Sequence, residues 1–265
     1  MKKILILLVA VMIGISASAQ LKAPQIIAHR GFHKSEGAAR NSLNALKAAQ
    51  EAKFWGSECD LQLTKDGEVL VVHGPYHPGA KEAKPRVQVQ HSTKKKVQDI
   101  LLESGETVPT LDEYLQQTAS AKGTKLIIEI KDQPTPKLET ELVQKTVDMV
   151  AKYNLQNEVE YIAFRPFVCW EIARLAPEGT KIAYLNGDYS PTYCKGMGCQ
   201  GIDYRYTVLK RKPNWIKEAH KQGMYVNVWT VNKEEDIRWC IQNGVDYITT
   251  DEPMLVKQII AEMCK

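Results

Sequence analysis

The sequence lacks a strong net charge, which argues against nucleic acid and anionic membranes as partners. It contains 35 Lys and Arg residues against 31 Asp and Glu residues, a formal net charge of +4. Lys2 and Lys3 belong to an N-terminal segment that we expect to be removed, which leaves 33 basic residues against 31 acidic ones. A chain so close to neutral has no broad positive field to attract nucleic acid or an anionic membrane surface. We therefore expect neither as a partner.

Long apolar runs are almost absent. The only one, Ile4–Ile15, is too short to span a bilayer well, so we expect no stable membrane insertion. It follows Lys2-Lys3 and precedes Ala17-Ser18-Ala19, which is the charged, apolar and small-residue order of a cleaved signal peptide. We therefore predict a signal peptide over residues 1–19 and an exported, periplasmic chain over residues 20–265. The alternative is a segment that is retained as an N-terminal anchor.

The cysteines show no zinc-site pattern. None of the six has a histidine close enough in sequence to complete such a site. In an oxidising compartment, Cys194 and Cys199 could close a small loop through a disulfide, but spacing alone does not fix the required geometry. That pairing therefore stays open. Cys59, inside an apolar run, is expected to be a small buried hydrophobe.

A Gly-rich phosphate loop is missing after the first predicted strand, which argues against an open doubly wound sheet. From residue 25 onward, apolar strand patterns alternate with helical ones, as expected for a parallel sheet. Asn41-Ser42, for example, can cap a helix that starts at Leu43. Eight such units in about 246 mature residues favour a closed (β/α)8 TIM barrel formed by a single domain. Residues 74–109 are predicted to be irregular. The predicted barrel strands are 25–29, 57–63, 125–131, 158–163, 181–185, 201–204, 224–229 and 247–250.

The stretch around the second predicted strand concentrates residues that carry chemistry. Glu58 and Asp60 are two apart in that strand, so both carboxylates lie on one face. Adjacent acids repel each other, and a divalent cation between them is the usual remedy. Asp66-Gly67 then favours a tight turn, and a second apolar run, Val69–Val72, brings His73 back towards the acids. This pattern indicates a functional site.

In a TIM barrel, functional residues gather at the carboxyl ends of the strands. Glu58, Asp60 and Glu129 fall there, and their hard oxygen ligands suit Mg²⁺ or Ca²⁺ better than Zn²⁺. We therefore predict one divalent cation. His29 and His73 fall at the same end, and two imidazoles beside a cation suit phosphodiester cleavage. One imidazole takes a proton from the nucleophile and the other protonates the leaving alkoxide.

Two cations and an aromatic ring complete the predicted site. Arg30 and Lys131 can hold a phosphate group, although Lys131 could instead form only an internal ion pair with Glu129. Trp229 also lies at a strand end, where simple packing is the alternative. Other polar residues are expected to play no direct part: Asp251 as a cap of the last helix, Tyr204 and Tyr206 as rim packing, and His77, His91 and His220 at the surface.

Short motifs along nearly the whole mature chain resemble, in order, those of the glycerophosphodiester phosphodiesterase family. They are A-H-R-G at 28–31, E-x-D at 58–60, T-K-D-G at 64–67, V-V-H at 71–73, E-I-K at 129–131, W-T-V-N at 229–232 and T-D-E-P at 250–253. The resemblance implies a TIM barrel that hydrolyses a small-molecule glycerophosphodiester to glycerol 3-phosphate and an alcohol. By the same resemblance, the catalytic histidines are His29 and His73, the metal ligands Glu58, Asp60 and Glu129, the phosphate contacts Arg30 and Lys131, and the aromatic wall for the glycerol Trp229.

Two positions depart from the family pattern. Arg40 stands where the family carries the acid of Pro-Glu-Asn-Thr, and Gly74 stands where Asp usually follows the second histidine. Because both histidines and all three acids are retained, we expect altered specificity rather than lost activity. The alternatives are an inactive barrel that binds glycerophospho-groups and a related phospholipase-type phosphodiesterase, against which the lack of an extended apolar loop counts. The released alcohol, the native ion, the oligomeric state and a cyclic phosphate intermediate are left open.

Overall fold

The structure, a computed structural model, describes residues 21–79 and 85–264. The predicted signal peptide, residues 1–19, lies outside the described residues. Eight parallel strands form a closed barrel, because β1 (Gln25–Ala28) pairs both with β2 (Gly56–Leu63) and with β11 (Tyr247–Thr250). The strand order is β1-β11-β10-β9-β8-β7-β6-β2. The other barrel strands are β6 (Lys125–Ile130), β7 (Val159–Ala163), β8 (Ile182–Tyr184), β9 (Gly201–Arg205) and β10 (Tyr225–Trp229).

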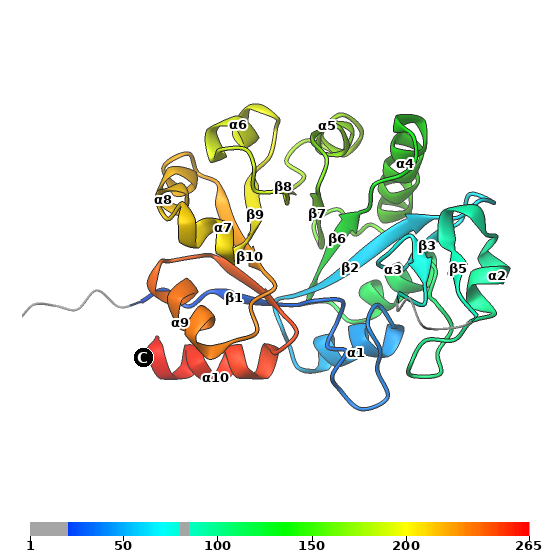
Figure 1. The fold of residues 1–265 in the computed structure, drawn as a ribbon, viewed down its shortest axis with the longest axis horizontal. Coiled ribbons are helices and arrows are strands. Elements are labelled where there is room, and N and C mark those ends of the chain that lie inside the picture. Colours follow the sequence, from blue (N-terminus) through cyan, green and yellow to red (C-terminus); the bar gives the residue numbers. More distant parts are fainter. Residues whose placement is uncertain (1–20, 80–84, 265) are drawn as a thin grey trace, which may run out of the picture.

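The predicted TIM barrel is therefore confirmed, and no strand end differs from its prediction by more than one residue. Helices surround the strands: in Figure 1, α1, α9 and α10 lie along one side and α4, α5 and α6 along the opposite side. None of the helices in the described part of the chain is both long and apolar enough to cross a membrane. The helices are α1 (Leu43–Glu51), α2 (Lys94–Gln98), α3 (Leu111–Ser120), α4 (Pro136–Lys152), α5 (Pro166–Leu175), α6 (Pro191–Gly196), α7 (Tyr206–Arg211), α8 (Asn214–Lys221), α9 (Glu234–Gln242) and α10 (Pro253–Met263).

Side chains alternate along each strand between the barrel interior and the surrounding helices. On β2, Cys59 and Leu61 pack in the large core beneath the helices, so Glu58 and Asp60 face the interior, as predicted. The barrel interior has a separate apolar cluster. This cluster closes the middle of the barrel, and polar groups are therefore left to the carboxyl ends of the strands. Its buried members are Ile27, Ile127, Ile162, Ala183 and Leu185.

A hairpin returns the chain from β2 towards the barrel, as the sequence predicted. Gly67 (φ +78°) makes the turn, and β3 (Val69–Val71) then pairs antiparallel with β2. The Val72 N–H donates to the Asp60 carbonyl over 2.8 Å, directly before His73. The hairpin therefore brings the second histidine back beside the acids.

The segment 74–109, predicted to be irregular, contains short elements where it is described. β4 (Tyr76–His77) and β5 (Val87–Gln88) pair antiparallel, and the 3-10 turn η1 (Val89–His91) and α2 follow. A small apolar core joins this segment to β3 and orders it. His77 was wrongly predicted to be a surface residue, since it is 4% exposed and its Nε2 lies 2.8 Å from the Ile100 carbonyl oxygen. His91 and His220 are exposed, as predicted.

All six cysteines are free thiols, and five of them are buried. The Cys194–Cys199 disulfide that the sequence left open is thus not formed in the structure. The Cys194 sulfur instead lies 3.1 Å from the hydroxyl of Tyr204, which also donates to the Tyr189 carbonyl. Tyr204 is fully buried beneath the helices and not at the barrel rim.

Candidate active site

The turn after β1 places His29 and Arg30 at the carboxyl end of the barrel. Arg30 (φ +56°) and Gly31 (φ +76°) are both in the left-handed region, which is strained for residues other than glycine. A Cβ atom at Gly31 would lie 2.6 Å from that of Ala45 in α1, so no side chain fits there. This backbone lets the Arg30 N–H donate to Glu58 Oε2 over 2.8 Å. The A-H-R-G turn therefore links β1 directly to the acids of β2.

Three buried carboxylates form one cluster on neighbouring strands. Glu58 and Asp60 come from β2, and Glu129 comes from β6, where it lies opposite Asp60 in the parallel ladder. One oxygen atom from each side chain lies within 4.8 Å of the other two. The cluster that the sequence predicted is thus assembled, and it is compact enough to hold a metal ion.

Two cations lie against this cluster. Lys131 Nζ is 2.6 Å from Glu129 Oε1 and 3.0 Å from Asp60 Oδ1, and Arg30 Nε is 3.3 Å from Asp60 Oδ2. The internal ion pair considered for Lys131 is therefore present. It does not remove Lys131 from the site, since the same amine also lines the cavity at the barrel mouth.

Burial sets the protonation of the three acids. It raises the pKa of Glu129 to about 7 and, together with repulsion from the neighbouring carboxylates, raises that of Glu58 well above its ordinary value. Burial also opposes ionisation of Asp60, but the adjacent Lys131 and Arg30 outweigh it and hold the pKa of Asp60 below its ordinary value. Glu58 Oε1 is buried and has no hydrogen-bond partner among the described residues. A buried oxygen of this kind needs a partner that the chain does not supply.

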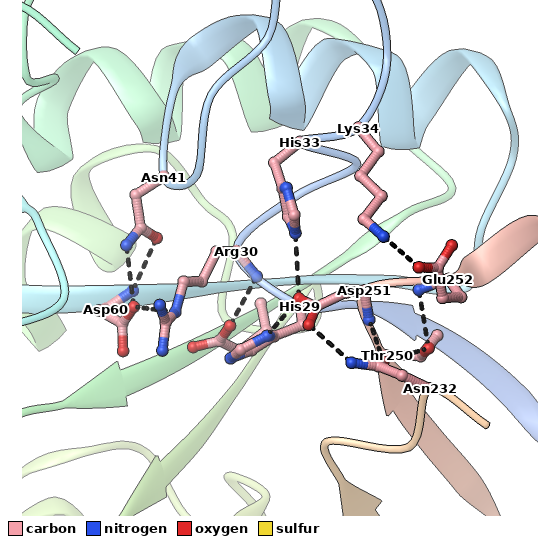
Figure 2. A network of polar contacts seen from close by, with 11 residues as sticks. His29, Arg30, His33, Lys34, Asn41, Asp60, Asn232, Thr250, Asp251 and Glu252 are labelled. Carbon is pink, nitrogen blue, oxygen red and sulfur yellow. Dashed lines mark hydrogen bonds and ion pairs between the residues drawn. The ribbon is translucent and has the colours of Figure 1, made fainter. Parts of the chain in front are cut away.

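His29 is oriented by Asp251, which follows β11. His29 Nδ1 lies 2.8 Å from Asp251 Oδ1, and Figure 2 shows this carboxylate between His29 and His33. Because an ionised carboxylate only accepts, the contact assigns the ring proton to Nδ1 and leaves Nε2 as an acceptor. Burial lowers the pKa of His29 and outweighs the effect of Asp251, so the ring is neutral near pH 7. This is the state that a general base requires.

Asp251 gathers three side chains and is not a helix cap. Its Oδ1 also accepts from His33 Nε2 over 3.0 Å, and its Oδ2 accepts from Asn232 Nδ2 over 2.8 Å. Burial would raise the pKa of Asp251, but the bonds from His29 and His33 hold it below its ordinary value. The predicted capping role was wrong: the residue that precedes α10 is Glu252, and no side-chain cap is formed. The W-T-V-N and T-D-E-P motifs therefore meet through Asn232 and Asp251.

The sequence reasoning also missed Asn41. Ser42 alone caps α1, where its hydroxyl accepts the Ala45 N–H over 3.1 Å. Asn41 instead adopts φ +62° and binds Asp60 twice. Its Nδ2 donates to Asp60 Oδ2 over 2.8 Å, and its Oδ1 accepts the Asp60 N–H over 3.2 Å. Figure 2 shows both Asn41 and Arg30 in contact with Asp60.

His73 follows β3 of the hairpin and lines the same cavity as the acids and the β1 turn. It is exposed, and desolvation together with the charges of Lys131 and Arg30 lowers its pKa to about 4, against the attraction of Asp60. A cavity of about 100 Å³ brings together seven of the eight predicted site residues. The eighth, Asp60, contacts two of the seven through its ion pairs. The seven are His29, Arg30, Glu58, His73, Glu129, Lys131 and Trp229.

Trp229 both packs and lines this cavity. Its indole Nε1 donates to the Asp203 carbonyl over 2.9 Å, which fixes the ring at the end of β10. Phe164 meets it edge to face with ring centroids 5.6 Å apart. Trp229 therefore packs in the barrel and also lines the site cavity, so the two predicted roles are compatible.

The two departures from the family pattern lie together in a larger cavity of about 450 Å³. Arg40 and Gly74 both line it, and it adjoins the smaller cavity at Arg30 and His73. Arg40 is exposed and forms no ion pair or hydrogen bond with any residue that the structure describes. The departures therefore bear on one entrance to the site and leave its charged centre unchanged.

Residues 29–255 match the glycerophosphoryl diester phosphodiesterase family. The chain belongs to this family. The match begins at His29 and runs past Asp251, so it contains every residue of the site described above. The predicted family is confirmed, and with it the assignment of the chain to the phosphodiesterases.

Individual relatives agree with this membership. A crystal structure of a glycerophosphodiester phosphodiesterase from Parabacteroides distasonis is 36% identical, with a TM-score of 0.86, and the match covers 92% of this chain and 99% of that one. A glycerophosphodiester phosphodiesterase from Caldanaerobacter subterraneus is 27% identical over 234 residues, which cover 86% of this chain and 94% of the relative. An Oleispira antarctica phosphodiesterase, solved in complex with the product sn-glycerol-3-phosphate, shares the fold at 21% identity and a TM-score of 0.77, with 90% of this chain and 97% of that one covered.

Proposed function

We propose that the chain hydrolyses glycerophosphodiesters to sn-glycerol 3-phosphate and an alcohol. One observation carries this proposal: a single cavity joins the oriented His29, the second imidazole of His73 and the carboxylate cluster. Each part is common in proteins, but together at one point they supply what phosphodiester cleavage uses. A negative phosphate must be neutralised while one proton is removed and another is delivered.

The carboxylate cluster fits one divalent cation, Mg²⁺ or Ca²⁺. Glu58, Asp60 and Glu129 offer hard oxygen ligands from two rigid strands, and Glu58 Oε1 has no other described partner. Burial raises the pKa values of Glu58 and Glu129, and a cation bound between them would favour their ionised forms. When bound, the ion would stabilise charge on a non-bridging oxygen of the phosphate. The ligand set gives no place to the sulfur or imidazole donors that zinc prefers.

The two histidines differ in a way that suggests their roles. His29 is neutral, with Nδ1–H held by Asp251, so its Nε2 can take a proton from the attacking nucleophile. His73 enters the same cavity from the hairpin after β3 and is the candidate acid for the leaving alkoxide. Its pKa is about 4 in the ligand-free protein, partly because Lys131 and Arg30 repel a proton. A bound phosphate would offset those charges and raise the pKa of His73 towards the value that an acid needs.

Arg30 and Lys131 are proposed to hold the phosphate. Both are tied to Asp60, which fixes their positions, yet each has more N–H groups than these contacts use. Arg30 is placed further by its own backbone, through the bond from its N–H to Glu58. Trp229 is proposed as the wall against which the carbon skeleton of the glycerol packs.

The experiment that tests this function measures release of glycerol 3-phosphate from glycerophosphocholine and glycerophosphoethanolamine. EDTA should abolish turnover, and Mg²⁺ or Ca²⁺ should restore it in the wild type but not in His29→Ala. A second substrate, bis(p-nitrophenyl) phosphate, separates the histidine roles, because its leaving group departs without a proton. His73→Ala should therefore keep much more of its activity on this substrate than on glycerophosphocholine.

Two results would contradict the proposed reaction, and a third would contradict the role given to His73. Binding of glycerophosphodiesters without turnover under any ion would favour the inactive, ligand-binding barrel. Turnover of lysophospholipids in preference to water-soluble glycerophosphodiesters would favour the phospholipase-type alternative. If both histidine variants lose equal activity on both substrates, the assignment of His73 as the acid is wrong.

We also propose that the chain is exported to the periplasm and cleaved after Ala19. The support is the order of Lys2-Lys3, the apolar run and Ala17-Ser18-Ala19. The intact mass of protein recovered from the periplasm should correspond to a chain that starts at Gln20. A chain that keeps residues 1–19 and sediments with membranes would instead establish the retained anchor.

A further inference from the structure

The site cavity extends below the charged cluster to a buried acid that the mechanism above does not use. Asp203 on β9 lines the same cavity as His29, Glu58 and Glu129. Its side chain lies on the inner face of the barrel, opposite Asn227 of β10 in the parallel ladder. The same cavity is also lined by the apolar residues Ile162, Phe164 and Leu185 and by Thr230 and Thr249.

The Asp203 carboxyl is incompletely satisfied. The residue is 1% exposed, and its Oδ1 has no hydrogen-bond partner among the described residues. Among the described residues, Asn227 is the one hydrogen-bond partner that acts on the pKa of Asp203. The amide of Asn227 is shared with Thr249, to which its Nδ2 donates over 2.9 Å. A buried carboxyl oxygen without a partner is costly, so such atoms in an enzyme commonly face a ligand or an ordered water.

Asp203 is also tied to the wall of the cavity. Its carbonyl accepts the indole N–H of Trp229, so the main chain of Asp203 positions the ring while its side chain lines the cavity below. The cavity of about 100 Å³ is lined by Asp203 and by the charged cluster together, so a ligand in it would meet both. Apolar walls beside the Asp203 carboxyl and the hydroxyl of Thr249 match the carbon chain and hydroxyls of a small polyol.

We propose that the Asp203 carboxyl binds a free hydroxyl of the substrate's glycerol and selects glycerol diesters over diesters of simple alcohols. This inference rests on the function proposed above, because it places the phosphate at the charged cluster and the glycerol below it. Asp203 is a specificity residue in this scheme and takes no proton from the reacting atoms.

The chemistry of the carboxyl suits this task. Burial raises the pKa of Asp203 to about 8, so near neutral pH the group carries a proton and can both donate to a hydroxyl and accept from it. A site that forms a buried hydrogen bond with a substrate hydroxyl discriminates strongly against the analogue that lacks it, because the protein group is then left unpaired. Apolar walls alone discriminate weakly.

The test compares glycerophosphocholine with propylphosphocholine, which has the same leaving group and carbon count but neither hydroxyl. With Mg²⁺ or Ca²⁺ present, the wild type should show a kcat/KM about 10- to 100-fold higher for glycerophosphocholine. Asp203→Leu should remove most of that preference by lowering kcat/KM for glycerophosphocholine, while kcat/KM for propylphosphocholine changes by less than about threefold. Asp203→Asn, which keeps a donor and an acceptor, should retain an intermediate preference.

Glu160→Gln is the matched control, because Glu160 is another buried acid of the barrel interior but is ion-paired with Lys181. It should leave the preference intact, and thermal melts of all variants should show which of them fold normally. Calorimetric binding of sn-glycerol 3-phosphate against propyl phosphate gives a readout that does not depend on turnover. The wild type should bind the glycerol compound more tightly, and Asp203→Leu should bind the two alike.

The possible outcomes separate this inference from the proposed function. Equal losses on both diesters in folded Asp203→Leu, or an unchanged preference, would overturn the role of Asp203 and leave the phosphodiesterase assignment standing. If the wild type turns over neither diester, the proposed function fails, and the binding comparison still decides whether Asp203 recognises the glycerol hydroxyl. Equal binding of both phosphates by the wild type would overturn the inference outright.

Discussion

The mouth of the barrel has two unlike sides. The charged side, on β1, β2, β6 and β11, carries His29, the three acids, Arg30, Lys131 and Asp251. Ion pairs and hydrogen bonds join these residues. The apolar side, on β7, β8 and β10, carries Phe164, Leu185 and Trp229, which contact one another mainly through rings and aliphatic groups. Both sides line the same cavity.

This difference indicates how one cavity could bind both the phosphate and the carbon skeleton of a diester. In the function proposed here, the charged side binds and activates the phosphate, and its groups are held in place by one another. The apolar side can only exclude water and pack against carbon, apart from the single acid below it. We therefore expect substitutions on the charged side to lower kcat and those on the apolar side to change KM and substrate preference.

The largest expected effect is at His29. His29→Ala should lower kcat by about 10²- to 10⁴-fold, because a positioned general base contributes a factor of this size. Steady-state kinetics on glycerophosphocholine measures it. A loss of less than about tenfold would show that the charged side does not act through His29. It would contradict the expectation that substitutions on this side mainly lower kcat.

Asp251→Asn should lower kcat by on the order of 10²-fold, less than the loss of the base itself. An amide can donate to His29 Nδ1 and so favours the tautomer that leaves no acceptor at Nε2. The chain contains a matched control, since His220 and Asp246 form a pair of the same 2.8 Å length near the N-terminal end of β11. Asp246→Asn should leave kcat unchanged, and equal losses in both variants would indicate a general effect on the barrel.

The pH dependence of ion binding tests the acids of the charged side. Burial raises the pKa of Glu129 to about 7 and also raises that of Glu58, so both carry protons at low pH and must lose them to bind a cation. Affinity for Mg²⁺ or Ca²⁺ should therefore rise with pH up to and somewhat above 7, by up to about tenfold per pH unit for each proton released. Calorimetry in two buffers with different ionisation enthalpies counts those protons. Affinity that is constant from pH 5 to pH 8 would show that the two acids are already ionised.

The charged side could largely be predicted from the sequence, whereas its supporting residues could not. Glu58 and Asp60 show a two-residue spacing that puts them on one face of a strand, and that rule depends only on local geometry. His33, Asn41 and Asp251 follow no such rule, because their partners are far away in sequence. His29 and Asp251 are 222 positions apart in sequence, and they meet only when the barrel closes β11 onto β1.

Asp203 and the short helices α6 and α7 were hard to predict for a related reason. Asp203 looked like an ordinary strand residue, because its burial depends on the inner face of the barrel and not on its neighbours in the chain. The helices α6 and α7 span only six residues each, which is too short to show a periodic apolar stripe. Contacts between residues far apart in sequence determine the burial of Asp203 and the formation of α6 and α7. The pattern of a single sequence does not show such contacts.

On the apolar side, Trp229→Leu should raise KM for glycerophosphocholine by about tenfold and change kcat by less than about threefold. The loss of a rigid aromatic wall removes on the order of 1–2 kcal/mol of packing that is similar in the ground and transition states. Trp170→Leu is the control, since Trp170 is 63% exposed on α5 and does not line the cavity. A fall in kcat as large as that of Asp251→Asn would show that the ring also supports the charged side.

The smallest effect is expected at Arg40, at the entrance between the two sides. Arg40→Glu should raise kcat/KM for glycerophosphocholine relative to glycerophosphoserine by about 3- to 10-fold, because it reverses a charge that faces the larger cavity. The effect should weaken as salt is added, since Arg40 is exposed and its field is screened. Lys221→Glu, the same charge reversal at the end of α8, should leave this kcat/KM ratio unchanged. Equal shifts in the two variants would mean that net charge, and not the position of Arg40, sets the preference for the alcohol.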